Sequence, residues 1–258
     1  MPESPDYTGL NRNRWNRVSA DYQVDHRTEL EGDVCWGGSM PPESELSVLG
    51  DVEGKDVLEL ACGGGQSAVY LGRRGALVVA VDYSHKQLEY AAAYARNEGI
   101  DVRFIETSVE DLSMLTDGGF DIAFSAFAFG FVERVDRAFR EAWRVLRPGG
   151  LFAFSWFSPA YECVELADDG RLLLTMNYFD RTPRVDTEEP WGTEVDFHRT
   201  YGDWHLALTD AGFVVTDVLE PEPLPRENVW SESHPLAKIR VIPGTTIWRA
   251  RRPRRLEF

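Results

Sequence analysis

The sequence has few cysteines and no long apolar run, and each shortage excludes a class of protein. Its three cysteines, Cys35, Cys62 and Cys163, are an odd number at wide spacing, which excludes a disulfide framework and a zinc-binding motif. No stretch reaches the roughly 18 to 20 apolar residues of a membrane-spanning helix, and residues 1–6 lack the basic and apolar regions of a signal peptide. We therefore expect a cytoplasmic protein that has no membrane partner and no metal.

Basic charge is also scarce. The formal net charge is -16, with 27 basic against 43 acidic residues, and Lys55, Lys86 and Lys238 are the only lysines. This balance argues against affinity for nucleic acid. Many acids with few lysines fit a salt-adapted protein, and a GC-rich codon usage explains the lysine shortage equally well. With 258 residues, 43% of them hydrophobic, the chain can form one α/β domain with an added segment of a few dozen residues.

Three consecutive glycines stand where a strand meets a helix. An apolar strand at 56–60 leads into Gly63, Gly64 and Gly65, a helix-forming segment follows at 67–74, and the next strand ends on Asp82. Glycines in this place let a ligand approach the backbone N–H groups and the helix N-terminus. A carboxylate at the end of the next strand can accept hydrogen bonds from the hydroxyls of a ribose. The pattern predicts half of a nucleotide-binding unit.

Two kinds of nucleotide site fit this loop. Gly63, Gly65 and Ala68 satisfy the dinucleotide pattern G-x-G-x-x-G/A, with Asp82 following at about the expected ~20 residues, which would suit an NAD-linked oxidoreductase. Glu59, however, lies within the strand, where a dinucleotide fold keeps an apolar residue. A buried carboxylate there is costly unless it is paired, so it favours a ligand with a cationic ammonium or a network of loop N–H groups.

Together with a distant L-R-P-G-G at 146–150, these residues resemble the class I S-adenosylmethionine (SAM) dependent methyltransferases, in particular the type 11 methyltransferase domains of an uncharacterised prokaryotic branch. The family's first motif, E/D-x-G-x-G-x-G, reads here Glu59-x-Ala61-x-Gly63-x-Gly65. Ala61 replaces the first glycine. The resemblance is firm over about 56–156, and it implies SAM as cofactor and methyl transfer to a small molecule by in-line displacement.

The resemblance also implies the fold: a Rossmann-like seven-stranded mixed sheet of order 3-2-1-4-5-7-6 with helices on both faces. We expect residues 1–50 to form an N-terminal helical cap, mobile over 1–11 and helical over 13–30, and 51–258 to form the methyltransferase domain. Residues 157–200 interrupt the alternation of strands and helices, with short strands expected at 177–179 and 194–198. A connection of this length is much longer than an ordinary loop between a strand and a helix, so it is a candidate substrate lid.

By the same resemblance, the residues expected to bind the cofactor lie along the first three strands and at the end of the fourth: Glu59, Ala61, Gly63, Gly65, Asp82, Tyr83, Gln87, Val109, Glu110 and Ser125. Tyr83 would flank the adenine, and Val109 would act through its backbone. Ser108 stands where the family has an Asp that binds the adenine amino group. Ser84 and Gln87 also form a capping box, which the helix that follows them requires by itself.

On the acceptor side we expect Tyr22, Trp36 and Phe127 to line the substrate pocket. Trp36 fits either a lid over the methionine end of the cofactor or an anchor for its own loop. A general base is optional for this chemistry, and His26, Tyr22 and His198 are the candidates. A non-catalytic SAM-binding module, regulatory or scaffolding, is the alternative function, with the pocket blocked by Trp36 or by 157–200. Monomer and homodimer both stay open.

Overall fold

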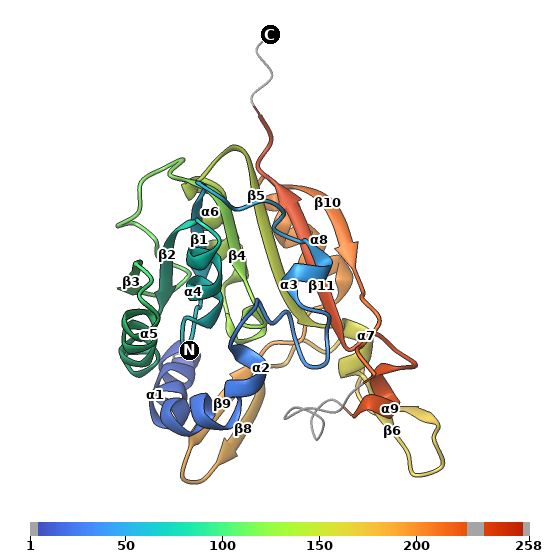
Figure 1. Ribbon diagram of the computed structural model, residues 1–258. Coiled ribbons are helices and arrows are strands. Elements are labelled where there is room, and N and C mark those ends of the chain that lie inside the picture. The colour runs from blue at the N-terminus through green and yellow to red at the C-terminus, as the bar shows by residue number, and fades with distance from the viewer. Residues whose placement is uncertain (1–4, 226–234, 255–258) are drawn as a thin grey trace.

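The computed structural model describes residues 5–225 and 235–254. A seven-stranded sheet forms the centre of the molecule (Figure 1). In sheet order its strands are β3 (Val102–Glu106), β2 (Leu77–Asp82), β1 (Asp56–Leu60), β4 (Phe120–Ser125), β5 (Leu146–Phe157), β11 (Thr245–Arg251) and β10 (Val214–Leu219). The first five run parallel, while β11 is antiparallel to both of its neighbours. The predicted order is confirmed, since β10 and β11 are the sixth and seventh strands of this sheet along the chain.

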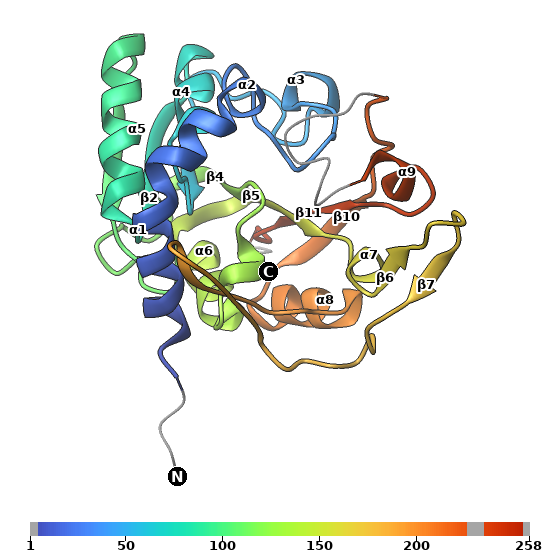
Figure 2. The same ribbon diagram turned by 90° about the horizontal axis from the view of Figure 1, so that it is seen from below.

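Helices cover both faces of the sheet (Figure 2). On one face lie α4 (Gln66–Arg73) and α5 (His85–Glu98), and on the other α6 (Val135–Val145) and α8 (Tyr201–Asp210). The central strands β1 and β4 are almost entirely buried, as expected for parallel strands covered on both sides. Each face has its own apolar core, and Leu58 and Val57 belong to opposite ones because successive strand residues alternate.

The L-R-P-G-G segment joins three strands. Helix α6 ends at Val145, and β5 begins directly after it at Leu146, so this segment forms the first five residues of β5. The Arg147 guanidinium contacts the Asp56 carboxylate at 2.7 Å and the Asp121 carboxylate at 2.6 Å. Asp56 is the first residue of β1, and Asp121 is the second residue of β4. The arginine therefore holds together the N-terminal ends of these two strands, whereas the glycine loop follows the C-terminal end of β1.

The N-terminal region is a long helix, α1 (Tyr7–Asp25), followed by α2 (Arg27–Leu30) and α3 (Glu43–Leu46). The Asp6 carboxylate accepts a hydrogen bond from the Gly9 N–H at 2.8 Å and so caps α1. The prediction of a mobile segment over 1–11 is therefore wrong from residue 7 onward, and residues 1–4 lie outside the described residues. In the part of the chain that is described, no helix is both long and apolar enough to cross a membrane.

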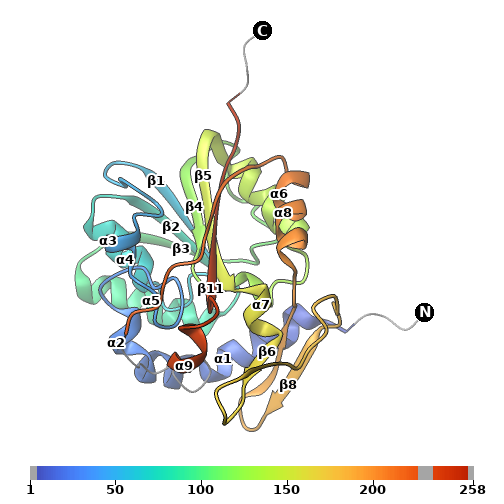
Figure 3. The ribbon, with the colours of Figure 1, turned by 90° about the vertical axis from the view of Figure 1, so that its right-hand side faces the viewer.

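The segment 157–200 contains α7 (Pro159–Glu162) and two hairpins, β6 (Val164–Leu166) with β7 (Leu172–Leu174) and β8 (Arg184–Glu188) with β9 (Gly192–Asp196). The strand expected at 177–179 is wrong, because a turn closes there with the Phe179 N–H donating to the Asn177 side chain at 3.0 Å. The β8–β9 hairpin lies beside α1 (Figure 3). The Asn11 side chain bonds both the N–H and the carbonyl of Val195, each at 2.7 Å. Two short helical turns complete the fold, η1 (Phe129–Phe131) and α9 (Leu236–Ile239).

Candidate active site

The glycine loop turns from β1 into α4 through residues with positive φ. Ala61 has φ 54°, Gly63 52° and Gly65 74°. At Gly65 a Cβ would also stand 2.9 Å from the Cβ of Ala91, so this glycine is required by conformation and by packing. Ala61 holds the left-handed conformation at a cost of about 1 to 2 kcal/mol. This strain is the physical reason why the family's pattern has glycine at that place.

Two buried carboxylates flank the loop. Asp82 accepts hydrogen bonds from the Gly63 N–H at 2.9 Å and from the Ser84 N–H at 2.8 Å. Burial raises the pKa of Asp82 to about 6, against the lowering effect of these N–H groups. Burial also raises the pKa of Glu59 to about 8, and Glu59 Oε2 has no hydrogen-bond partner. A buried acceptor without a donor calls for a ligand that supplies one.

A cavity of about 1040 Å³, counting its open mouth, lies between the loop and α1. It brings together most of the predicted site residues: Tyr22, Glu59, Ala61, Gly63, Asp82, Tyr83, Gln87, Val109, Glu110 and Phe127. Gly65, Ser125, Trp36, His26 and His198 are not among the described residues that line it. Gly65 packs behind the loop, and Ser125 is fully buried within the sheet.

Four rings, Trp15, Tyr22, Phe127 and Phe131, line the same cavity, and we call them the aromatic wall. Trp15 meets Tyr22 and Phe131 edge to face, with ring centroids 5.2 Å and 5.9 Å apart. Phe127 has φ 56°, and its N–H donates to the buried Ser155 hydroxyl at 3.0 Å. A non-glycine residue held in this conformation where β4 ends marks a position that the surrounding structure over-determines.

Three glutamines join α1 to the glycine loop, and we call Gln23, Gln66 and Gln87 the glutamine cluster. The Gln23 amide donates to the Gln87 side chain at 2.8 Å and accepts from the Gln66 amide. A Cβ on Gly64 would stand 2.5 Å from the Gln23 amide, so glycine is needed there for α1 to lie so close. The Ser84 hydroxyl caps α5 as predicted, accepting from the Gln87 N–H at 3.2 Å. The side chain of Gln87, however, turns to Gln23, so the capping box is incomplete.

Trp36 is an anchor for its loop. Its side chain is fully buried, and the indole N–H donates to the Glu43 carboxylate at 3.0 Å. The same carboxylate accepts from the Val48 and Leu49 N–H groups at 3.0 Å and 2.7 Å. Of the two interpretations of Trp36, the substrate contact is wrong, because this bonding holds the ring in the core against Phe124.

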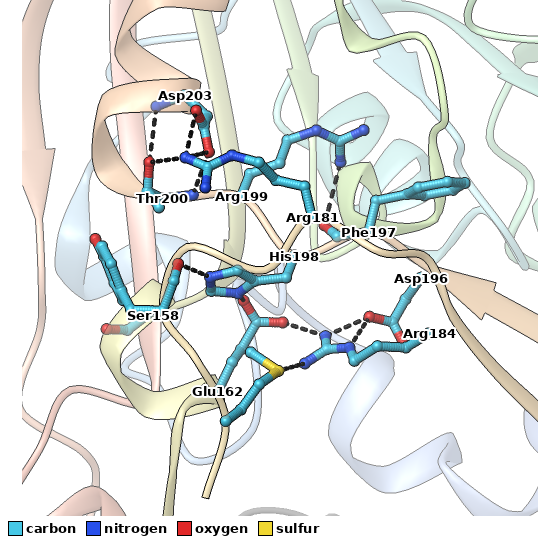
Figure 4. A network of polar contacts seen from close by, with 12 residues as sticks. Ser158, Glu162, Arg181, Arg184, Asp196, Phe197, His198, Arg199, Thr200 and Asp203 are labelled. Carbon is cyan, nitrogen blue, oxygen red and sulfur yellow. Dashed lines mark hydrogen bonds and ion pairs between the residues drawn. The ribbon is translucent and has the colours of Figure 1, made fainter. Parts of the chain in front are cut away.

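The two histidine candidates lie away from the cavity. His198 is buried in the 157–200 segment, with Nδ1 2.9 Å from the Glu162 carboxylate and Nε2 3.0 Å from the Tyr178 carbonyl (Figure 4). Glu162 also pairs with Arg184, so the histidine belongs to a structural network. His26 stacks on Tyr22 with ring centroids 4.0 Å apart and is not among the described lining residues. The prediction of His198 as a general base is wrong, because both ring nitrogens face protein acceptors.

A parallel sheet with a glycine loop after β1, an acid ending β2 and a cavity at the carboxyl ends of the strands defines a nucleoside-binding enzyme of the Rossmann-like class. Comparisons with known proteins narrow this class. A family model described as a methyltransferase domain matches residues 58–154. The uncharacterized methyltransferase YbaJ of Bacillus subtilis is 30% identical over 179 residues, which are 66% of this chain and 69% of YbaJ.

The crystal structure of an S-adenosylmethionine dependent methyltransferase from Mesorhizobium loti matches with a TM-score of 0.65 and 28% identity, over 81% of this chain and 96% of that one. A malonyl-[acyl-carrier protein] O-methyltransferase of Pectobacterium atrosepticum is 34% identical over 44% of this chain and 43% of its own length. The chain belongs to the class I SAM-dependent methyltransferases, and SAM is its cofactor. The NAD-linked alternative is therefore set aside.

Proposed function

We propose that the protein transfers the methyl group of SAM to a small molecule held between the glycine loop and the aromatic wall. The observation that carries this proposal is that one cavity contains both parts. Its lining contains Gly63, Asp82 and Glu59 together with the four rings of the aromatic wall. A methyltransferase needs such adjacent places, because the rate depends on holding two reactants in line.

The part of the cavity beside the glycine loop fits the cofactor. The unpartnered Glu59 Oε2 would receive the ammonium of the methionine part, and Asp82 would accept from the ribose hydroxyls. Gly63 lines the cavity, and the space that a side chain would fill there is open, so the cofactor can approach the backbone. Val109 and Tyr83 would border the adenine. When bound, SAM supplies a methyl group already activated by a positively charged sulfur.

The protein's own contribution is then positioning and exclusion of water. In the described lining of the cavity there is no histidine and no lysine, and Glu59 and Asp82 lie at the cofactor end. Tyr22 is the remaining candidate base from the sequence, and it also forms part of the aromatic wall. We assign Tyr22 and Phe127 to orienting the acceptor, with the closed site strengthening the electrostatic contacts inside it.

A small acceptor suits the closure of this site. Helix α1 is bonded to β9 through Asn11 and to α4 and α5 through Gln23, so it covers the cavity on the side away from the sheet. The segment 157–200 contributes no described residue to the cavity lining and supports α1 instead. We therefore propose that this segment closes the site indirectly, by holding α1 over the cavity. The obstruction expected of a non-catalytic module, by Trp36 or by 157–200, is absent from the described lining.

The acceptor itself can be sought directly. Purified protein is incubated with cell extract fractionated by size and with SAM carrying a labelled methyl group, and labelled products are identified by mass spectrometry. The proposal predicts a labelled small molecule that disappears when Asp82→Ala replaces the wild type. A labelled peptide or nucleic acid would refute the small-molecule part. The relatives do not settle this point, since one is named for an acyl-carrier-protein substrate and another has no known acceptor.

A further inference from the structure

The charges around the cavity are of one sign. Glu59, Asp82 and Glu110 line it, and among its described lining residues there is no arginine, lysine or histidine. From this we infer that the acceptor is an uncharged molecule with a flat ring, and that the site selects against acceptors that carry a carboxylate or phosphate. The inference rests on the proposed function and adds the chemical class of the substrate.

Two arginines on segments that border the cavity bond to other groups. Arg14, on α1, contacts the carboxylates of Glu188 and Glu194 at 3.1 Å and 3.2 Å. Arg199 is half-buried beside the 129–133 turn and donates to backbone carbonyls, among them that of Glu133 at 3.0 Å. An anionic acceptor would leave water without gaining a cation from the described lining, which is costly in a partly closed site. SAM differs, because its carboxylate is accompanied by the ammonium and the sulfonium of the same molecule.

The shape and chemistry of the aromatic wall favour a ring. Trp15 and Phe131 stand edge to face at 5.9 Å, and Phe131 in turn meets Trp156 at 4.9 Å, so the rings support one another. Ala126, Ala128, Val132 and Leu30 add further apolar surface to the same cavity. Aromatic side chains bind flat rings by stacked or edge contacts with centroids roughly 4.5 to 7 Å apart.

An uncharged acceptor also agrees with the surrounding carboxylates. As a hydroxyl or amine is methylated, its lone pair forms the new bond to carbon, and the electron pair of the carbon–sulfur bond stays on sulfur. The positive charge passes to the acceptor until its proton leaves to water. The acidic lining of the cavity favours a positive charge over a negative one throughout this sequence. A cationic amine is excluded as the reacting form, because its nitrogen has no lone pair.

Matched ring compounds test the inference without turnover. The protein is saturated with S-adenosylhomocysteine, and binding of 2-naphthol and of 2-naphthoate is measured by calorimetry near neutral pH. We expect naphthol to bind at least ~10-fold more tightly. Equal or tighter binding of naphthoate overturns the charge selection, and failure of both probes overturns the flat-ring class. Absence of S-adenosylhomocysteine binding would instead refute the proposed function, so the two failures are distinguishable.

A positive charge added to the cavity lining gives a second test of the inference. Val132→Lys adds a cation where the described lining has none, and Val24→Lys adds the same charge on α1 at a side chain that is 72% exposed. We expect Val132→Lys to reverse the preference or reduce it at least ~10-fold, with affinity for S-adenosylhomocysteine retained, and Val24→Lys to behave as the wild type. An unchanged preference in a folded Val132→Lys protein overturns the inference, as does an equal effect of Val24→Lys.

Discussion

Asp82 Oδ2 accepts the Gly63 N–H at 2.9 Å, so the acid that ends β2 holds the loop that follows β1. Its other oxygen accepts the Ser84 N–H, where α5 begins. One carboxylate thus aligns the glycine loop, the end of a strand and the start of a helix before any ligand binds. Prearranged groups of this kind lower the cost of ordering a site when its ligand arrives.

Glu59→Gln is expected to stabilise the ligand-free protein above about pH 5 and to weaken SAM binding. Burial raises the pKa of Glu59 to about 8 from its ordinary 4.5, so the folded protein retains a proton that the unfolded chain loses. The stability contributed by this group therefore falls as pH rises from about 4.5 to about 8. Glutamine does not ionise and so carries no such cost. The Tm of the variant should therefore exceed that of the wild type by an amount that grows as pH rises from about 4.5 to about 8, by about 2 to 4 °C for each kcal/mol.

Thermal unfolding from pH 5 to 9, with and without SAM, measures both effects of this substitution. Glu53→Gln, at an exposed position just before β1, is the control and should leave the curves unchanged. A Tm difference for Glu59→Gln that does not vary with pH, or SAM affinity equal to the wild type, would contradict the role given to this carboxylate.

Gln23→Ala is expected to speed the release of SAM by roughly 10-fold. Gln23 is 1% exposed and bonds two helices that border the cofactor loop, so its loss loosens the closure by α1. The expected cost is about 1 to 2 kcal/mol for buried hydrogen bonds. Stopped-flow displacement of SAM measures the rate. Val24→Ala, on the exposed side of α1, is the matched control, and equal rates for both variants would argue against α1 as the cover.

Ala61→Gly is expected to stabilise the fold, although most substitutions to glycine destabilise. Ala61 has φ 54°, which glycine adopts without strain, and the entropic cost of glycine offsets part of the gain. The expected net change is about 0.5 to 1 kcal/mol. Ala142→Gly, within α6, should instead destabilise by at least about 1 kcal/mol. Urea midpoints measure both, and destabilisation by Ala61→Gly would show that the methyl group has a packing role there.

Glu162→Gln is expected to reduce stability by about 1 to 3 kcal/mol and to leave SAM affinity unchanged. The Glu162 carboxylate is buried between His198 and Arg184, and its neutralisation weakens both contacts, while Arg184 keeps its pairing with Asp196. Glu165→Gln, an exposed neighbour, should have no measurable effect. Denaturant unfolding measures the stability of both variants, and titration with SAM measures their affinity for the cofactor. Weaker SAM binding with normal stability would show that this network reaches the cofactor site.

The strands and the glycine loop could be predicted because local patterns specify them. Buried parallel strands read as short apolar runs, and a loop that needs positive φ selects glycine, so Glu59, Gly63 and Asp82 stand out in the sequence. Helix α1 was expected only from residue 13, and its start at Tyr7 was missed, since the first turn contains Gly9 and depends on the Asp6 cap. That cap is a single side-chain contact, which composition does not reveal.

The acceptor side of the site could be predicted only in part, because it depends on tertiary contacts between distant segments. Gln23 and Gln66 were missed, since a polar side chain in a helix gives no sign of which helix it will meet. The residues that α1 buries, Gly9, Asn11, Ser19 and Gln23, are small or polar, so no apolar periodicity marks its packed face. Trp36 and His198 have residue types common in active sites, but Glu43 and Glu162 hold them in structural networks.

Calorimetry of SAM with the wild-type protein and with Asp82→Ala tests the central claim most directly. Asp101→Ala, exposed before β3, serves as the control. We predict sub-millimolar affinity for the wild type and the control, and at least ~10-fold weaker binding for Asp82→Ala, as expected for lost charge-assisted hydrogen bonds. Binding by Asp82→Ala as tight as that of the wild type, or no binding of SAM by the wild type, would contradict the account.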